Sequence, residues 1–133
     1  MYRKEFLTPQ RNKDLHDTFL KVISDMDVIV LDEAINRTVN SPAKRFYIGS
    51  DRAYGVLIRW DRYGITKLAT PLRHEMFEEI YRRTLELRKI MPDKPIMHLV
   101  EIVLEQPAPK FYLETSSVKT ILCKYRQRKH CVL

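Results

Sequence analysis

The chain carries the stretch Pro42-Ala43-Lys44-Arg45-Phe46-Tyr47-Ile48, and the similar stretch Pro107-Ala108-Pro109-Lys110-Phe111-Tyr112-Leu113 follows 65 positions later (from 42 to 107). The likeness continues beyond these stretches, because Trp60 is answered by Tyr125 at the same shift. Self-similarity at a fixed period is the signature of one structural unit used more than once. The repeat therefore predicts two similar units.

Each of the two stretches is followed by apolar side chains at helical spacing. Ser50 and Thr115 are suited to cap the start of a helix in the two copies. The apolar residues then recur at offsets of 0, 3, 4 and 7, which predicts an amphipathic third helix in each copy. These residues are Ala53, Val56, Leu57 and Trp60 in the first copy, and Val118, Ile121, Leu122 and Tyr125 in the second.

Two earlier helices are expected in each copy. Apolar spacing predicts a first helix from about Asn12, and the corresponding helix of the second copy from about Leu72. A second helix is expected from Asp27 onward, although its run of β-branched residues also fits a buried strand. Pro42 and Pro107 close the second helices, because proline cannot donate a helical hydrogen bond.

These elements define the expected fold and its boundaries. The chain has only three glycines, which disfavours a turn-rich β fold. We expect an all-α protein, built as a tandem pair of three-helix, helix-turn-helix-like units with a short extended connector before each third helix. The expected segments are a basic N-terminal arm (1–12), a first helical repeat (13–66) and a second helical repeat with a basic C-terminal tail (67–133). A single bundle in which the two copies interlock is the alternative.

Charge and cysteine content narrow the classes of partner and compartment. The 133 residues carry a net charge of +7, which favours anionic partners such as nucleic acid, an acidic protein surface or a membrane face. A protein that is merely basic is the alternative. Two cysteines do not make a disulfide framework, and no signal peptide or long apolar run is evident. These features predict a cytoplasmic, intracellular protein that does not enter a membrane.

The third helices suggest a function. The second copy reads Glu114-Thr115-Ser116-Ser117-Val118-Lys119-Thr120-Ile121-Leu122 and resembles the recognition helix of a helix-turn-helix arrangement, although the preceding connector is longer. In that arrangement the apolar face docks the helix and the polar face enters a DNA groove. A capped surface helix with no partner is the alternative. The predicted DNA contacts are Arg52, Tyr54 and Arg59 in the first copy, Ser117, Lys119, Thr120 and Lys124 in the second, and Arg126, Arg128 and Lys129 in the basic tail.

The repeated Phe-Tyr pairs have a different interpretation. Aromatic side chains beside Lys and Arg can stack on nucleic-acid bases. Burial of Phe46 and Phe111 would contribute roughly 1.5–3 kcal/mol each, which a small unit needs. We therefore assign the two phenylalanines to the core. In an extended segment Tyr47 and Tyr112 point the opposite way, so a functional role for them stays open.

Catalytic patterns are not evident in the sequence. The four histidines are scattered, and no nucleophile motif or phosphate-binding glycine loop is found. We expect no catalytic residues, no metal site and no cofactor. The predicted function is non-enzymatic DNA binding, specific or nonspecific. The alternative is a small structural or adaptor protein of a larger assembly, such as a virion or mobile-element component, that binds another protein through its repeated surface. Homo-oligomerisation stays open in both cases.

Overall fold

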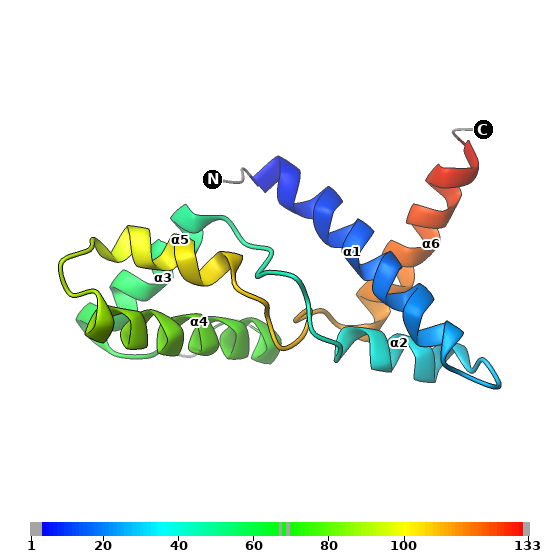
Figure 1. Ribbon diagram of the computed structural model, residues 1–133, viewed down its shortest axis with the longest axis horizontal. Coiled ribbons are helices and arrows are strands. Elements are labelled where there is room, and N and C mark those ends of the chain that lie inside the picture. The colour runs from blue at the N-terminus through cyan, green and yellow to red at the C-terminus, as the bar shows by residue number, and fades with distance from the viewer. Residues whose placement is uncertain (1–3, 67, 69, 132–133) are drawn as a thin grey trace.

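The computed structural model describes the backbone of residues 4–66, 68 and 70–131, and the side chains of residues 7–66, 68 and 70–125. Within these residues the chain is all-helical, which confirms the expected class (Figure 1). The helices are α1 (Lys4–Ser24), α2 (Leu31–Val39), α3 (Ser50–Tyr63), α4 (Pro71–Ile90), α5 (Ile96–Glu105) and α6 (Thr115–Cys131).

The third helix of each copy packs on the helices of the other copy. α3 contacts α4 and α5, whereas α6 contacts α1 and α2. Across the described residues, α3 makes no helix contact with α1 or α2, and α6 makes none with α4 or α5. Figure 1 shows the resulting α3–α4–α5 lobe and α1–α2–α6 lobe, joined by two connectors that run side by side. The copies therefore interlock and do not sit side by side as self-contained units.

The two connectors meet at corresponding residues of the repeat. The Ala43 N–H donates to the Ala108 carbonyl at 2.9 Å, and the Ala108 N–H donates to the Ala43 carbonyl at the same distance. This pair is an isolated antiparallel bridge. Because each alanine is both hydrogen-bond donor and acceptor toward its counterpart in the repeat, an approximate two-fold axis passes between the two residues.

A second pair of hydrogen bonds obeys the same two-fold relation. The Phe46 N–H donates to the Leu104 carbonyl at 3.0 Å. The counterpart bond runs from the Phe111 N–H to the Val39 carbonyl at 3.1 Å. Each bond ties a connector to the end of the second helix of the other copy. These backbone hydrogen bonds therefore stabilise the crossover, by which we mean the exchange of third helices between the two copies.

The aromatic pairs close the centre of the molecule. Phe46 stacks on Tyr112 with ring centroids 6.1 Å apart, and Tyr47 stacks on Phe111 at 6.0 Å. Phe46 and Phe111 are buried, as the sequence predicts, while the two tyrosines are half-buried. The phenylalanine of each copy therefore stacks on the tyrosine of the other copy, and these aromatic contacts help to stabilise the pairing of the two connectors.

The third helices are docked through their predicted apolar faces. Trp60 is only 2% exposed and meets the edges of Phe77 and Tyr81 on α4. Its counterpart Tyr125 lies 4.7 Å from His16 on α1, measured between ring centroids. The other buried residues of these faces are Ala53, Val56 and Leu57 on α3, and Val118 and Leu122 on α6.

Two helix starts differ from the prediction. α1 begins at Lys4 instead of Asn12, so most of the expected N-terminal arm is helical. Leu7 is buried and gives this segment an apolar anchor, although Pro9 inside the helix cannot donate a helical hydrogen bond. α2 is a helix and not a strand, but it begins at Leu31 instead of Asp27. The β-branched residues before it have low helix propensity and no side-chain cap to start a helix earlier.

The starts of α3 and α4 each lie within one residue of the predicted position. Gly49, and not Ser50, occupies the capping position of α3, and Ser50 is its first residue. α4 begins at Pro71, one residue before the predicted Leu72, and the Thr70 side chain accepts a hydrogen bond from the Arg73 N–H at 3.3 Å. Proline at the first helical position and threonine at the cap are both favourable there.

Candidate nucleic-acid interface

α6 separates an apolar face from a polar one. Val118 and Leu122 are buried in the lobe where this helix packs on α1 and α2, and Tyr125 is half-buried. The opposite face is short and polar near the start of the helix, which allows close approach of a partner. The four contact residues predicted on this part of α6 are all exposed: Ser117, Lys119, Thr120 and Lys124.

The charge on α6 has one sign. Its sequence from 115 to 131 contains no Asp or Glu. Lys119 and Lys124 are exposed, and neither forms an ion pair among the described side chains. The predicted contacts Arg126, Arg128 and Lys129 lie outside the described side chains, although the helix itself continues to Cys131.

α3 carries the equivalent predicted residues in a different charge environment. Arg52 and Arg59 are exposed, and Tyr54 is half-buried. The same helix also carries Asp51 and Asp61, both exposed. The positive charge of this surface is therefore diluted, in contrast to α6.

The crossover keeps the two predicted surfaces on separate lobes. Arg52, Tyr54 and Arg59 lie on the α3–α4–α5 lobe, and the α6 residues lie on the other lobe (Figure 1). No helix contact joins α3 to α6 within the described residues. The predicted residues therefore form two surfaces instead of one.

A hollow lies beside the start of each third helix, and sequence reasoning missed both. The hollow beside α6 has a volume of about 350 Å³, and the one beside α3 about 150 Å³. Each is bounded by the second helix of the other copy, so residues far apart in the sequence meet there and no local pattern could reveal it. The first is lined by Asp32, Ile35, Asn36, Thr115, Ser116 and Lys119, and the second by Arg45, Ser50, His98, Glu101, Ile102, Leu104 and Glu105.

The Tyr47 hydroxyl has a structural partner. It donates a hydrogen bond to a carboxylate oxygen of Asp14, which is 3% exposed. The other oxygen of Asp14 accepts from the Gln10 amide at 2.9 Å and lies 3.7 Å from the Lys44 ammonium. Burial, and then the bond to Asp14, raises the pKa of Tyr47. These contacts explain Tyr47 as part of the fold.

Tyr112 is the counterpart of Tyr47 in the second copy, but no hydrogen bond from its hydroxyl is found within the described residues. Burial, with a smaller contribution from nearby carboxylates, raises the pKa of Tyr112 to about 12. The Lys110 ammonium lies 5.6 Å from the centre of its ring, and the ring stacks on Phe46. Tyr112 also adopts a positive φ of 56°, which costs a non-glycine residue on the order of 1 kcal/mol or more.

Across the described residues, no three His, Cys, Asp or Glu side chains are grouped closely enough to hold a metal ion. In the same part of the chain, no helix combines the length and apolar character needed to cross a bilayer.

Comparison with known proteins gives no relative. No protein-family model matches the chain, and no curated protein or solved structure matches it either.

Proposed function

We propose that the chain is a non-enzymatic DNA-binding protein in which α6 makes the main contact with the duplex. The observation that carries the proposal is the exposed face of α6, which bears Lys119 and Lys124 without an ion pair and without an acidic residue on the helix. Lysine and arginine side chains supply the phosphate contacts that dominate affinity for DNA. The short side chains of Ser117 and Thr120 let the helix approach the groove closely.

α3 provides a second, weaker contact in this proposal. Arg52 and Arg59 are exposed, but Asp51 and Asp61 on the same helix repel phosphate. Two binding surfaces on one chain raise the apparent affinity through effective concentration when both can reach one DNA. The proposal therefore gives the two third helices unequal roles, with α6 dominant.

A salt titration with a labelled duplex tests the proposal. The logarithm of the binding constant should fall linearly with the logarithm of the salt concentration, by roughly 0.9 for each phosphate neutralised. Replacing Lys119→Ala and Lys124→Ala together should weaken binding at least tenfold and lower the slope by about 2. Arg52→Ala with Arg59→Ala should weaken binding less.

A matched control separates a local contact from net charge. Lys89→Ala with Lys94→Ala removes two exposed positive charges from the other lobe, where neither lysine forms an ion pair among the described side chains. This pair should leave binding nearly unchanged. An equal loss of DNA affinity in the control variant would show that only net charge matters. If the parent chain does not bind the duplex at ~50 mM salt, the DNA proposal is ruled out. Docking on another protein would then be the remaining function.

A further inference from the structure

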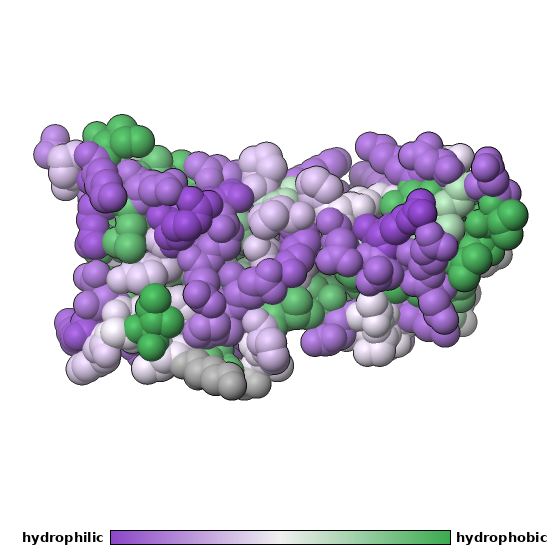
Figure 2. Space-filling model, turned by 90° about the horizontal axis from the view of Figure 1, so that it is seen from below, coloured by the Kyte–Doolittle hydropathy of each residue, from purple (hydrophilic) through white to green (hydrophobic). Residues whose placement is uncertain are grey.

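One end of the molecule exposes an apolar loop. The residues between α1 and α2 form what we call the front patch, which consists of Val28, Ile29, Val30 and Leu31. Val28 is 76% exposed, and the other three side chains are between 48% and 59% exposed. Figure 1 places this loop at the far tip of the α1–α2–α6 lobe, and hydrophobic residues gather at the same end in Figure 2. Among the described residues, these four side chains together leave a large apolar surface exposed to solvent.

The opposite end exposes a second apolar set. The rear patch consists of Tyr63, Ile65 and Ile90, which are 73%, 55% and 74% exposed. Tyr63 ends α3 and Ile90 ends α4. An ion pair of 3.4 Å between Arg88 and Asp61 ties these two helix ends together, so Tyr63 and Ile90 lie at one end of the molecule, and Ile65 follows Tyr63 in the chain after one residue.

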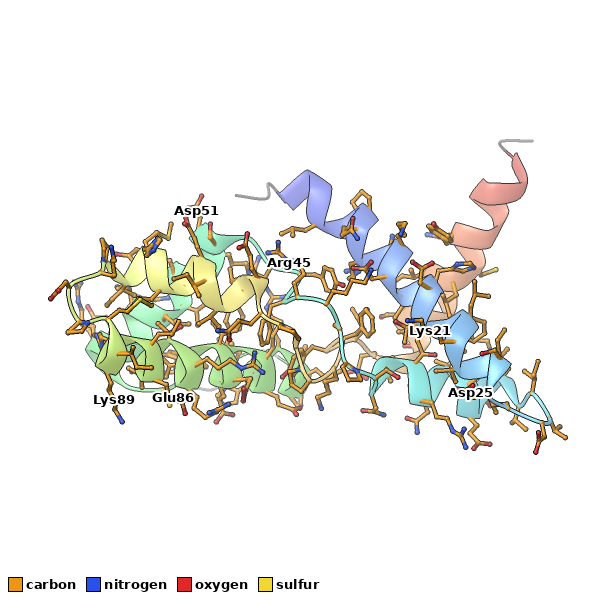
Figure 3. All side chains as sticks on the ribbon, viewed as in Figure 1. Lys21, Asp25, Arg45, Asp51, Glu86 and Lys89 are labelled. Carbon is orange, nitrogen blue, oxygen red and sulfur yellow. The ribbon has the colours of Figure 1, made fainter. Side chains whose placement is uncertain are left out.

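The residues around the two patches carry opposite charge. Figure 3 shows Asp25 near the front end and Lys89 near the rear end. Single apolar residues on a surface are ordinary, but a contiguous patch with charged neighbours marks an interaction site. Exposed acids adjoin the front patch in sequence, namely Asp25, Asp27 and Asp32. Arg62, Lys89 and Lys94 adjoin the rear patch together with the acid Asp93, while Asp61 at this end is paired with Arg88.

The repeat relates the loops at the two ends of the molecule. The loop 25–30 corresponds to 90–95 at the shift of 65 positions, and each joins the first and second helix of its copy. Ile29 has Lys94 as its counterpart, and Asp25 has Ile90. The approximate two-fold axis therefore presents two related loops in opposite directions. The loop 25–30 carries two acids, whereas the loop 90–95 carries one acid, Asp93, and one base, Lys94.

We propose that the front patch of one molecule binds the rear patch of a second copy of this chain, so that the protein associates head to tail. The acidic border of the front patch then meets the basic border of the rear patch. A contact between two front patches would place like charges opposite each other and is disfavoured. A head-to-tail contact leaves one patch of each kind unused, so association continues beyond two molecules or closes into a ring.

The association is expected to be weak and dependent on salt. Seven side chains make a smaller contact than the interfaces of stable complexes, which bury about 1,200–2,000 Å². Sedimentation of the full, nucleic-acid-free chain at ~10–500 µM and ~50 mM salt should show an average mass that rises with concentration. At ~500 mM salt the rise should be reduced, because the charges that border the patches are screened. This behaviour does not depend on DNA binding.

Variants that block one end give the sharpest test. Val28→Ser with Ile29→Ser blocks the front, and Tyr63→Ser with Ile90→Ser blocks the rear. Each blocked variant should be monomeric alone, while an equal mixture should form dimers and nothing larger. If the rear-blocked variant still dimerises alone, the contact joins two front patches and the proposal is wrong. Circular dichroism and melting check that these surface changes leave the fold intact.

A charge exchange tests the complementarity itself. Asp25→Lys with Asp27→Lys should abolish association, as should Lys89→Glu with Lys94→Glu. A mixture of the two variants should restore it, because every contact again joins opposite charges. Asp51→Lys, an exposed acid between the two ends in Figure 3, is the control and should associate normally. A parent chain that stays monomeric up to ~500 µM overturns the proposal.

Discussion

Ala43 and Ala108 exchange both of their backbone hydrogen bonds, at 2.9 Å each, and they hold the same position in the two copies of the repeat. This relationship makes the chain the intramolecular counterpart of a domain-swapped dimer, in which identical elements are exchanged between protomers. Neither copy completes a lobe by itself, because each gives its third helix to the other.

The crossover predicts how half-chains behave. Fragments 1–66 and 67–133 should each fail to fold as a monomer, since each lacks the partner for its own third helix. Mixed in equal amounts they should form a 1:1 complex that regains helical circular dichroism and a blue-shifted Trp60 emission. A folded monomeric fragment 1–66 with a buried Trp60 would contradict the exchange of helices.

Trp60 should be the most costly side chain of α3 to remove. It is 2% exposed and contacts Phe77 and Tyr81, so Trp60→Ala should lower the free energy of unfolding by about 3–5 kcal/mol. Urea unfolding followed by circular dichroism measures this loss. Tyr125→Ala, at the half-buried counterpart position, is the matched comparison and should cost less.

The Tyr47 hydroxyl should contribute to stability through the buried Asp14. Tyr47→Phe removes a hydrogen bond to a charged group and should lower the free energy of unfolding by roughly 1.5–3 kcal/mol. The control is Tyr112→Phe, because the structure shows no hydrogen bond from that hydroxyl within the described residues. Equal effects of the two changes would assign the loss to the rings and not to the bond with Asp14.

Stability should decline at alkaline pH through the same tyrosines. Their folded-state pKa values are raised, that of Tyr112 to about 12, whereas an unfolded tyrosine titrates near ~10. Below pH ~10 both tyrosines are protonated in the folded and unfolded states, and their contribution to the free energy of unfolding is complete. Above pH ~10 the unfolded state loses these protons first, so the free energy of unfolding falls as the pH rises toward the folded-state pKa. Urea unfolding from pH 8 to 11 should show a shallower decline for Tyr47→Phe with Tyr112→Phe than for the parent. Lysine titration cancels in this comparison.

Several features of the fold could be predicted from local sequence. The buried faces of α3 and α6 follow the repeated apolar spacing, as the burial of Trp60 and Val118 confirms. The burial of Phe46 and Phe111 was also predictable, because a small unit needs its large apolar side chains. Helix starts were less accurate: Leu7 anchors an earlier start of α1 only because tertiary packing buries it.

The candidate site could be predicted only in part. Exposure of Lys119 and Lys124 fits the helical spacing, which places them on either side of the buried stripe that contains Val118 and Leu122. The separation of this surface from Arg52 and Arg59 does not follow, since it depends on which lobe receives each third helix. The charged ends could not be recognised either, because a run such as Val28-Ile29-Val30 looks like core until the structure shows it exposed.

The sequence by itself determined that the chain is helical, that a unit of 65 residues occurs twice, and which face of each third helix is buried. Periodicity has this power because a side chain's direction on a helix depends only on its position along the chain. Tertiary structure alone decided the partner of each buried face. The apolar stripe of a third helix is stabilised by burial away from water, but either copy's first two helices could bury it. The paired connectors at Ala43 and Ala108 favour the arrangement in which each third helix packs on the other copy.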